Sequence, residues 1–377
     1  MVALLTTTVT FAQQAIFQAR GVTSPEINAD NTVTFRVRAP KAITVKVTGD
    51  CINGRTADMV EKDGVWEYTT PEPVAPDMYT YNFIIDGQRV LDMNNVAVNR
   101  DVASLTNILL VGGSERADLY QIKNVPHGTV SRIWYHSDFE GIDRRLTVYT
   151  PAGYETSGKR YPVFYLLHGI GGDEEAWITQ GRTSQVLDNL IAQGKAQPMI
   201  VVMTNGNISQ EAAPLENSTG YNVPSMGLPK TMEGSFETAF PEIVKFIDKT
   251  YRTIPQKRSR AIAGLSMGGF HSKFISQNNP DMFNYIGLFS AAIGVTDPSI
   301  SPIYQDNDQK LATLFSKKPA LYWIGIGNED FLYKNNTDYR KFLDEHGYKY
   351  TYMETSGGHI WKNWRIYLTE FVPLLFK

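Results

Sequence analysis

The residues best suited to chemistry lie in the stretch GLSMGG, residues 264–269. Its first five residues fit G-x-S-x-G, with Ser266 between two glycines. The segment RAIAGLS is expected as a strand, and residues 267–277 have helical periodicity. A tight strand-to-helix turn would hold the hydroxyl at a helix N-terminus, where free N–H groups face a developing oxyanion. The pattern predicts that Ser266 is a nucleophile; a glycine-rich turn with an idle serine is the alternative.

A serine nucleophile needs a histidine base downstream, because the base follows the serine in α/β-hydrolases. Three histidines follow Ser266. His271 lies one turn into the following helix, where a packing role is expected. His346 ends a polar helix in LDEHGYKY and is interpreted as a cap. His359 lies in the flexible loop TSGGHIW after the last expected strand, so we expect His359 to be the general base.

The carboxylate that orients the base is expected directly after the strand ALYWIGIG. The sequence NEDF offers two candidates there, Glu329 and Asp330, and we assign Asp330. Other acidic residues lie in the preceding loop and are expected to be solvated: Asp297, Asp306 and Asp308.

Oxyanion donors are expected from the loop LLHGIGGDEEAW, which follows a buried strand. Its glycines leave the backbone free to direct N–H groups toward a reacting carbonyl. We expect the oxyanion hole to combine the N–H of Met267 with that of Ile170. His168 is expected to order the loop.

The elements that must position these residues follow from hydrophobic patterning. From Arg144 onward, apolar runs such as YPVFYLLHG, PMIVVMTN and YIGLFSA alternate with helix-period segments. This alternation predicts a mostly parallel sheet with helices on both faces. Before Gly112, short alternating segments such as TVTFRVRA and MYTYNFIIDG are separated by turn signals, which predicts a small immunoglobulin-like β-sandwich. The predicted boundaries are a leader at 1–20, a β-sandwich at 21–112, a polar linker at 113–128 and an α/β domain at 129–377.

Composition narrows the class of protein further. A chain of 377 residues exceeds what one core usually holds, which favours two domains. The net charge of −3 gives no electrostatic footprint for nucleic acid. Cys51 is the only cysteine, so no intrachain disulfide can form, and the six histidines show no metal-ligand spacing. We expect no metal and no cofactor.

The first residues bear on localisation. MVALLTTTVTFA is apolar and resembles the hydrophobic region of a secretory signal, although it lacks a charged start. No apolar run of membrane-spanning length follows. We therefore expect a secreted or periplasmic protein without a membrane span; the oligomeric state is left open.

Four spaced motifs carry a resemblance to a known family: LLHGIGGDEEAW, AIAGLSMGG, GNEDF and GGHIWKNWR. Together with VYTPAGY, they resemble carbohydrate esterase family one, in particular its feruloyl esterases, over residues 129–377. The resemblance implies an α/β-hydrolase with Ser266 as nucleophile, His359 as base and Asp330 as orienting acid. It implies Ile170 and Met267 as oxyanion donors.

The resemblance also suggests substrate contacts. Trp177 and Trp361 fall near the expected mouth of the site, as walls for an aromatic acyl group or as packing residues. Tyr221 is a further candidate in the loop 205–233, where family members vary most. The N-terminal β-block resembles family 48 carbohydrate-binding modules, although no pair of exposed aromatic residues can be identified in it.

These expectations favour a serine esterase that removes ferulate from arabinoxylan. An acetyl xylan esterase is the nearest alternative, because the triad is indifferent to the acyl group. A siderophore trilactone esterase is a second, disfavoured by the near-neutral charge and by expected export. A glycan-binding protein without catalysis is the least favoured.

Overall fold

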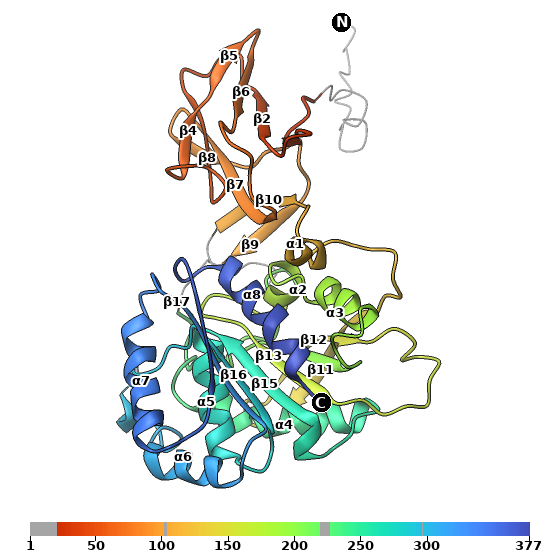
Figure 1. Cartoon of the computed structure of the whole chain (residues 1–377), viewed down its shortest axis with the longest axis vertical. Coiled ribbons are helices and arrows are strands. Elements are labelled where there is room, and N and C mark those ends of the chain that lie inside the picture. Colours follow the sequence, from red (N-terminus) through yellow and green to blue (C-terminus); the bar gives the residue numbers. More distant parts are fainter. Residues whose placement is uncertain (1–20, 102–103, 219–226, 296) are drawn as a thin grey trace, which may run out of the picture. The chain divides into compact units, whose positions relative to one another are not determined.

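The computed structural model describes residues 21–101, 104–218, 227–295 and 297–377, and these fall into two compact units (Figure 1). The first unit contains most of the described chain up to Val111. The second contains Gly112–Lys377 together with two short segments, Pro76–Met78 and Asn99–Leu105. No helix among the described residues is long and apolar enough to cross a membrane.

The first unit is a sandwich of two β-sheets, as predicted. One sheet has the order β1 (Glu26–Ile27), β2 (Val33–Arg38), β6 (Val65–Thr69), β5 (Val60–Lys62). The other has the order β4 (Thr56–Asp58), β3 (Val45–Gly49), β7 (Asp77–Ile85), β10 (Ser104–Val111), β9 (Val98–Asp101), with β8 (Gln88–Val90) beside β7. Phe35 of β2 packs on Tyr81 of β7, with ring centroids 4.9 Å apart, and both rings lie in the core between the sheets.

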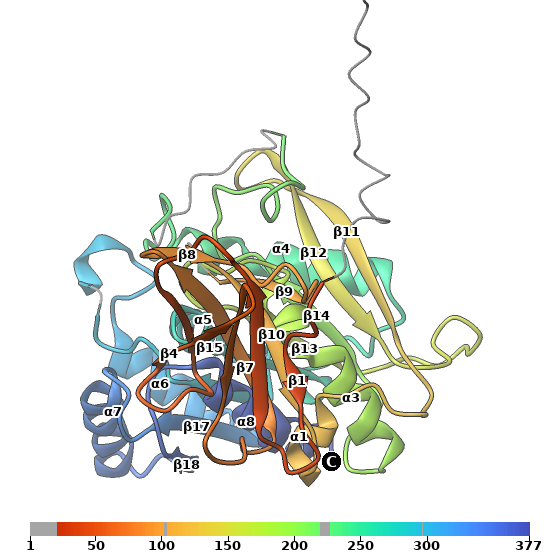
Figure 2. The same cartoon turned by 90° about the horizontal axis from the view of Figure 1, so that it is seen from above.

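The second unit is built on one mixed sheet. Its order is β11 (Thr129–Ser137), β12 (Ile142–Thr150), β14 (Ile200–Thr204), β13 (Val163–Leu167), β15 (Arg260–Leu265), β16 (Tyr285–Phe289), β17 (Leu321–Gly327), β18 (Thr351–Thr355). The pairs from β14 to β18 are parallel, whereas β11 and β12 are antiparallel and form one edge, seen in Figure 2. The central strands read as continuous apolar runs because they are buried on both faces.

Helices cover both faces of this sheet (Figure 1). They are α1 (Glu115–Leu119), α2 (Ala176–Thr179), α3 (Thr183–Ala192), α4 (Ser235–Thr250), α5 (Met267–Asn278), α6 (Asn307–Ser316), α7 (Tyr333–Glu345) and α8 (Trp361–Phe371), with 3-10 turns η2 (Lys257–Ser259), η3 (Pro298–Ile300) and η4 (Val372–Leu374). On one face, Phe240 of α4 packs on Tyr165 of β13 at 5.5 Å. On the other, Phe371 of α8 packs on Phe164 of β13 at 5.7 Å. Successive residues of one strand therefore fill two different cores.

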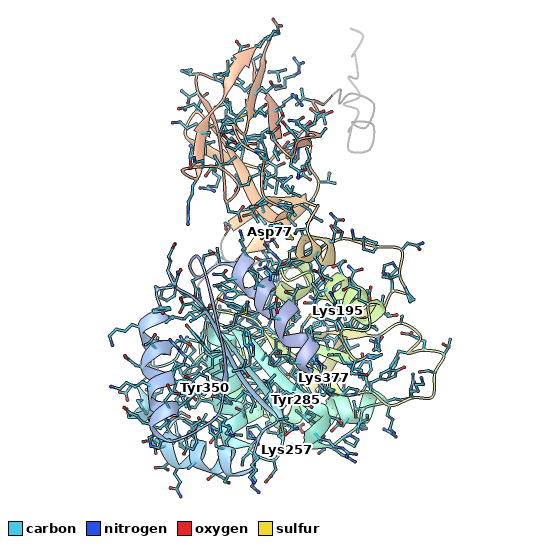
Figure 3. All side chains as sticks on the ribbon, in the orientation of Figure 1. Asp77, Lys195, Lys257, Tyr285, Tyr350 and Lys377 are labelled. Atoms are coloured by element: carbon cyan, nitrogen blue, oxygen red, sulfur yellow. The ribbon has the colours of Figure 1, made fainter. Side chains whose placement is uncertain are left out.

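The direction of the parallel strands separates two ends of the unit. β16 begins at Tyr285, whose ring lies 5.1 Å from that of Phe376, next to Lys377 (Figure 3). It ends at Phe289, whose carbonyl accepts the N–H of Ser266 at 2.8 Å. The predicted chemistry thus gathers at the carboxyl ends of the strands, where open α/β sheets form their sites.

The segment after Gly112 differs from the polar linker expected from the sequence. Ser114 caps α1 by accepting the N–H of Ala117 at 3.2 Å. Asn189 of α3 then donates to the carbonyl of Leu119 at 3.0 Å, and Leu119 is buried. The start of this segment has a helix and buried apolar side chains of its own. It is therefore part of the second unit and not an open linker between the units.

Candidate active site

The turn at Ser266 has the strained geometry of a nucleophile held out of line. β15 ends at Leu265 and α5 begins at Met267, so the serine occupies the single residue between strand and helix. Its φ of 53° and ψ of −114° are sparsely populated for a residue with a side chain. Hydrogen bonds to Phe289 on one side and from Ala292 on the other hold this backbone in place.

The glycines beside the serine are required by close backbone approach. A Cβ added to Gly264 would lie 2.5 Å from the carbonyl oxygen of Gly268. A Cβ added to Gly268 would lie 2.5 Å from the carbonyl oxygens of Leu167 and His168. Real Cβ atoms do not come this close to backbone atoms, so the motif G-x-S-x-G packs strand β15, helix α5 and the end of β13 together.

His359 and Asp330 form a hydrogen-bonded pair. Nδ1 of His359 lies 2.8 Å from Oδ2 of Asp330, and the carboxylate is buried. The other oxygen, Oδ1, accepts the N–H of Leu332 at 2.9 Å. With both oxygens engaged, the carboxylate holds the imidazole with Nδ1 protonated, which leaves Nε2 free to accept a proton. Glu329, the alternative acid, is exposed.

Ser266 and His359 line one cavity of about 200 Å³ at the ends of β13 and β15. Its wall combines loop backbone, aliphatic groups and two indole rings: Gly169, Ile170, Gly172, Ala176, Gln180, Leu265, Trp361 and Trp364. The cavity therefore brings the predicted nucleophile and base together with the predicted oxyanion loop.

The N–H groups of Ile170 and Met267 suit the role of oxyanion donors. Ile170 lines the cavity, and Met267 is the first residue of α5, where an N–H has no intrahelical partner. Within the described part of the chain, neither N–H donates to a protein acceptor. Two free N–H groups beside a serine can stabilise the negative oxygen of a tetrahedral intermediate.

His168 links the oxyanion loop to the loop after β14 through its two ring nitrogens. Nδ1 lies 2.6 Å from the carbonyl oxygen of Gly169, and Nε2 accepts the N–H of Gly206 at 2.8 Å. Because Nε2 accepts, the ring is neutral with its proton on Nδ1. Burial lowers the pKa of His168 to about 4, so this hydrogen-bond pattern persists at neutral pH.

The structure gives different positions to the two tryptophans that were predicted as substrate contacts. Trp361 lines the cavity, whereas Trp177 is only 1% exposed and donates its indole N–H to the carbonyl of Leu167 at 2.9 Å. Trp177 packs edge-to-face under Trp361 at 5.2 Å, so it supports the wall without being part of it. Tyr221 lies outside the described residues.

Two further aromatic residues were missed by sequence reasoning. Trp364 lines the cavity and lies 4.9 Å from the ring of His359, edge-to-face. Its spacing of three from Trp361 on α8 was the available signal. Phe331 lies 4.6 Å from the ring of His359, and only its place after Asp330 could have indicated this contact.

The remaining titratable candidates lie elsewhere. His346 caps α7 as predicted, with Nδ1 2.8 Å from the carbonyl oxygen of Phe342. His271 is fully buried against Glu237. Burial raises the pKa of Cys51 to about 12, which disfavours its reactive thiolate. Among the described residues, no group of three or more His, Cys, Asp or Glu side chains is placed to hold a metal ion.

Two families match the sequence. Residues 140–375 match the family described as "Putative esterase". Residues 21–99 match carbohydrate-binding module 48, described as the isoamylase N-terminal domain. The matches cover the two sequence regions from which an esterase and a family 48-like module were predicted.

One curated relative is similar along nearly the whole chain. It is an endo-1,4-beta-xylanase/feruloyl esterase of Xylanibacter ruminicola, 31% identical over 360 residues, which are 94% of this chain and 46% of that protein. The chain thus spans about half the length of this relative.

Solved structures support the fold. A ferulic acid esterase is 28% identical with a TM-score of 0.53, covering 66% of this chain and 97% of that one. The enterobactin esterase FES of Shigella flexneri has a TM-score of 0.64 at 17% identity and covers 97% of this chain and 98% of that one. At 17% identity, the similarity to the enterobactin esterase shows the fold alone.

Proposed function

The chain belongs to the esterase family whose match it carries, and we propose that it is a serine esterase that hydrolyses feruloyl esters of arabinoxylan. The observation that carries this proposal is the cavity beside Ser266, with two indole rings in its wall. The similarity to a xylanase/feruloyl esterase supports the same substrate class.

The proposed reaction uses Ser266, His359 and Asp330 in sequence. Nε2 of His359 takes the proton of the serine hydroxyl while Oγ attacks the ester carbonyl carbon. The carbonyl oxygen becomes negative and is stabilised by the N–H groups of Ile170 and Met267. His359 then gives its proton to the alcohol oxygen as the C–O bond breaks, which leaves an acyl-enzyme. Water attacks this ester by the same route and releases the acid.

The cavity favours an aromatic acyl group over acetyl. Its volume of about 200 Å³ is many times the roughly 10 to 15 Å³ that a cavity needs to hold one water molecule, so it has room for more than an acetyl group. Trp361 and Trp364 contribute indole rings to its wall, and aromatic side chains suit a phenolic ring. Gln180 adds a polar group to the same wall, where ring oxygens could be recognised.

For the N-terminal β-sandwich we propose carbohydrate recognition, which its match to carbohydrate-binding module 48 supports. Among the described residues of this unit, however, the exposed large apolar side chains are not aromatic, and Trp66 and Tyr68 are half-buried. Glycan binding that depends on exposed aromatic rings therefore has no candidate in this described region. We place the polysaccharide contacts of highest affinity on the esterase unit.

A secreted or periplasmic location is part of the proposal. So is a division into a β-sandwich domain at 21–112 and an esterase domain that includes the segment 113–128 as well as 129–377. The leader-like segment 1–20 lies outside the described residues. Recovery of a processed chain from the culture medium or periplasm would support export. A full-length chain confined to the cytoplasm would contradict it.

The test is a side-by-side initial rate on methyl ferulate and on an acetylated xylo-oligosaccharide, with Ser266→Ala as the blank. We expect ferulate release well above acetate release. Acetate release alone would replace the proposal with an acetyl xylan esterase. Release of neither would return the siderophore esterase and the non-catalytic glycan-binding protein as the leading interpretations.

A further inference from the structure

Phe331 is exposed although it touches the predicted base. Its side chain is 74% exposed, and its ring lies 4.6 Å from that of His359 at an angle of 52°. Among the described residues, those that line the cavity beside Ser266 do not include Phe331. A single exposed apolar side chain is ordinary by itself. The contact with the ring of His359 is what places Phe331 where a substrate of that base would pass.

The proposed reaction determines which part of the substrate passes this ring. His359 must give its proton to the alcohol oxygen of the ester, so that oxygen lies next to the imidazole. The acyl group fills the cavity between Ser266 and the indole rings. The group attached to the alcohol oxygen therefore continues past His359, on the side of the imidazole that the cavity does not occupy.

The residues before Phe331 add polar groups to the same loop. Asn328 and Glu329, which connect β17 to Asp330, are both exposed. An apolar ring next to an amide and a carboxylate matches a sugar, whose ring has C–H faces and hydroxyl edges. The backbone of the loop is held in place, because Asn328 donates to the carbonyl of Thr355 at 2.9 Å and Glu329 to that of Gly357 at 3.1 Å.

We infer that Phe331, with Asn328 and Glu329, forms a subsite for the sugar that carries the ester. The subsite rests on the proposed function, because only an alcohol with a sugar attached would reach it. Phe331 adjoins the ring of His359 and is not among the residues that line the cavity, so this subsite would take the alcohol part of the ester while the indole-lined cavity takes the acyl group. Its ligand class is a pentose or short oligosaccharide esterified through a hydroxyl.

The experiment compares two substrates with the same acyl group. Methyl ferulate has a one-carbon alcohol, and a feruloylated arabinoxylo-oligosaccharide has a sugar. We expect Phe331→Ala to lower kcat/KM on the oligosaccharide about tenfold, mainly through KM, because roughly 50 Å² of ring contact is lost. The rate on methyl ferulate should change less than about twofold, which is the size of effect expected at an exposed position without contacts to the substrate.

Two matched variants accompany it. Phe331→Tyr keeps the ring and should restore the preference for the oligosaccharide. Phe139→Ala removes another exposed phenylalanine, in the turn between β11 and β12, and should leave kcat/KM unchanged on both substrates.

Equal losses on both substrates would overturn the inference, since they would show that Phe331 only positions His359. Unchanged rates on both would also overturn it. If the wild-type protein released ferulate from neither substrate, the proposed function itself would fail, and the subsite with it.

Discussion

Of the histidine–carboxylate pairs among the described residues of the second unit, two have both side chains largely buried and nearly the same local geometry. Nδ1 of His359 lies 2.8 Å from Asp330, and Nδ1 of His271 lies 2.9 Å from Glu237. Glu237 also accepts the hydroxyl of Tyr304 at 3.0 Å. A distance alone would not tell which pair belongs to a catalytic triad.

The surroundings distinguish the two pairs. The side chains of His271 and Glu237 are fully buried, and Nε2 of His271 has no hydrogen-bond partner in the described part of the chain. The ring of His271 packs edge-to-face on Phe236 at 4.9 Å. His359 instead lines a cavity together with Ser266. A histidine–carboxylate pair can act as a base only when the second nitrogen reaches a substrate and a nucleophile.

Removing the nucleophile or the base should have the largest effect. We expect Ser266→Ala and His359→Ala each to lower kcat by about 10⁴- to 10⁶-fold. The melting temperature should be nearly unchanged in Ser266→Ala but lowered in His359→Ala, because the buried carboxylate of Asp330 loses its partner. Initial rates on methyl ferulate and thermal unfolding measure the two quantities. Substantial turnover in Ser266→Ala would remove the triad from the mechanism.

Replacing the orienting acid should have the next largest effect. Asp330→Asn keeps the shape but favours the wrong tautomer of His359, so we expect kcat to fall about 10³- to 10⁴-fold. Asp338→Asn changes an exposed carboxylate on α7 and serves as the matched control. An unchanged rate in Asp330→Asn would move the acid to Glu329 or elsewhere.

The buried pair should respond in stability. His271→Ala leaves the Glu237 carboxylate buried without its partner, which typically costs about 3 to 5 kcal/mol of unfolding free energy. Below its lowered melting temperature, the variant should keep its kcat within a few-fold. Urea unfolding and the rate per folded molecule check this. If His271→Ala lost kcat without losing stability, His271 would take part in the chemistry. The two pairs would then not differ in function.

Replacing a third buried group, Lys273 on α5, should have the smallest effect on stability. That effect should depend on pH. Its Nζ bonds the side chains of Gln277 and Asn307 and lies 3.9 Å from the centroid of the Phe274 ring. Burial lowers the pKa of Lys273 from 10.5 to about 7. The unfolded chain then binds more protons between these pH values, so this lysine makes the fold more stable as pH rises from about 7 to 10.5.

Lys273→Met removes this dependence. We expect the free energy of unfolding of the variant to be roughly 1 to 3 kcal/mol higher than that of the wild type at pH 6 to 7. This difference should disappear toward pH 10. Urea unfolding at pH 6.5 and 9.5 provides the measurement. A difference that does not vary with pH would show that the lysine titrates alike in both states.

The sequence alone determined the parts that depend on contiguous residues. The turn at Ser266 was predictable because a buried strand, G-x-S-x-G and a helix follow one another. The glycines are needed because backbone atoms approach them too closely for a side chain. The parallel sheet was predictable because strands buried on both faces are apolar throughout. Chain order and a glycine-containing loop led to the choice of His359 as the base, and its contact with Asp330 is consistent with that prediction.

Only the tertiary structure decided between residues of the same type. Glu329 and Asp330 are adjacent, and the turn after β17 directs one carboxylate to His359 and leaves the other exposed. Trp177 and Trp361 also looked alike, yet one is packed beneath the other. The physical reason is that these choices depend on contacts between segments far apart in the chain, whose side-chain directions no local pattern encodes.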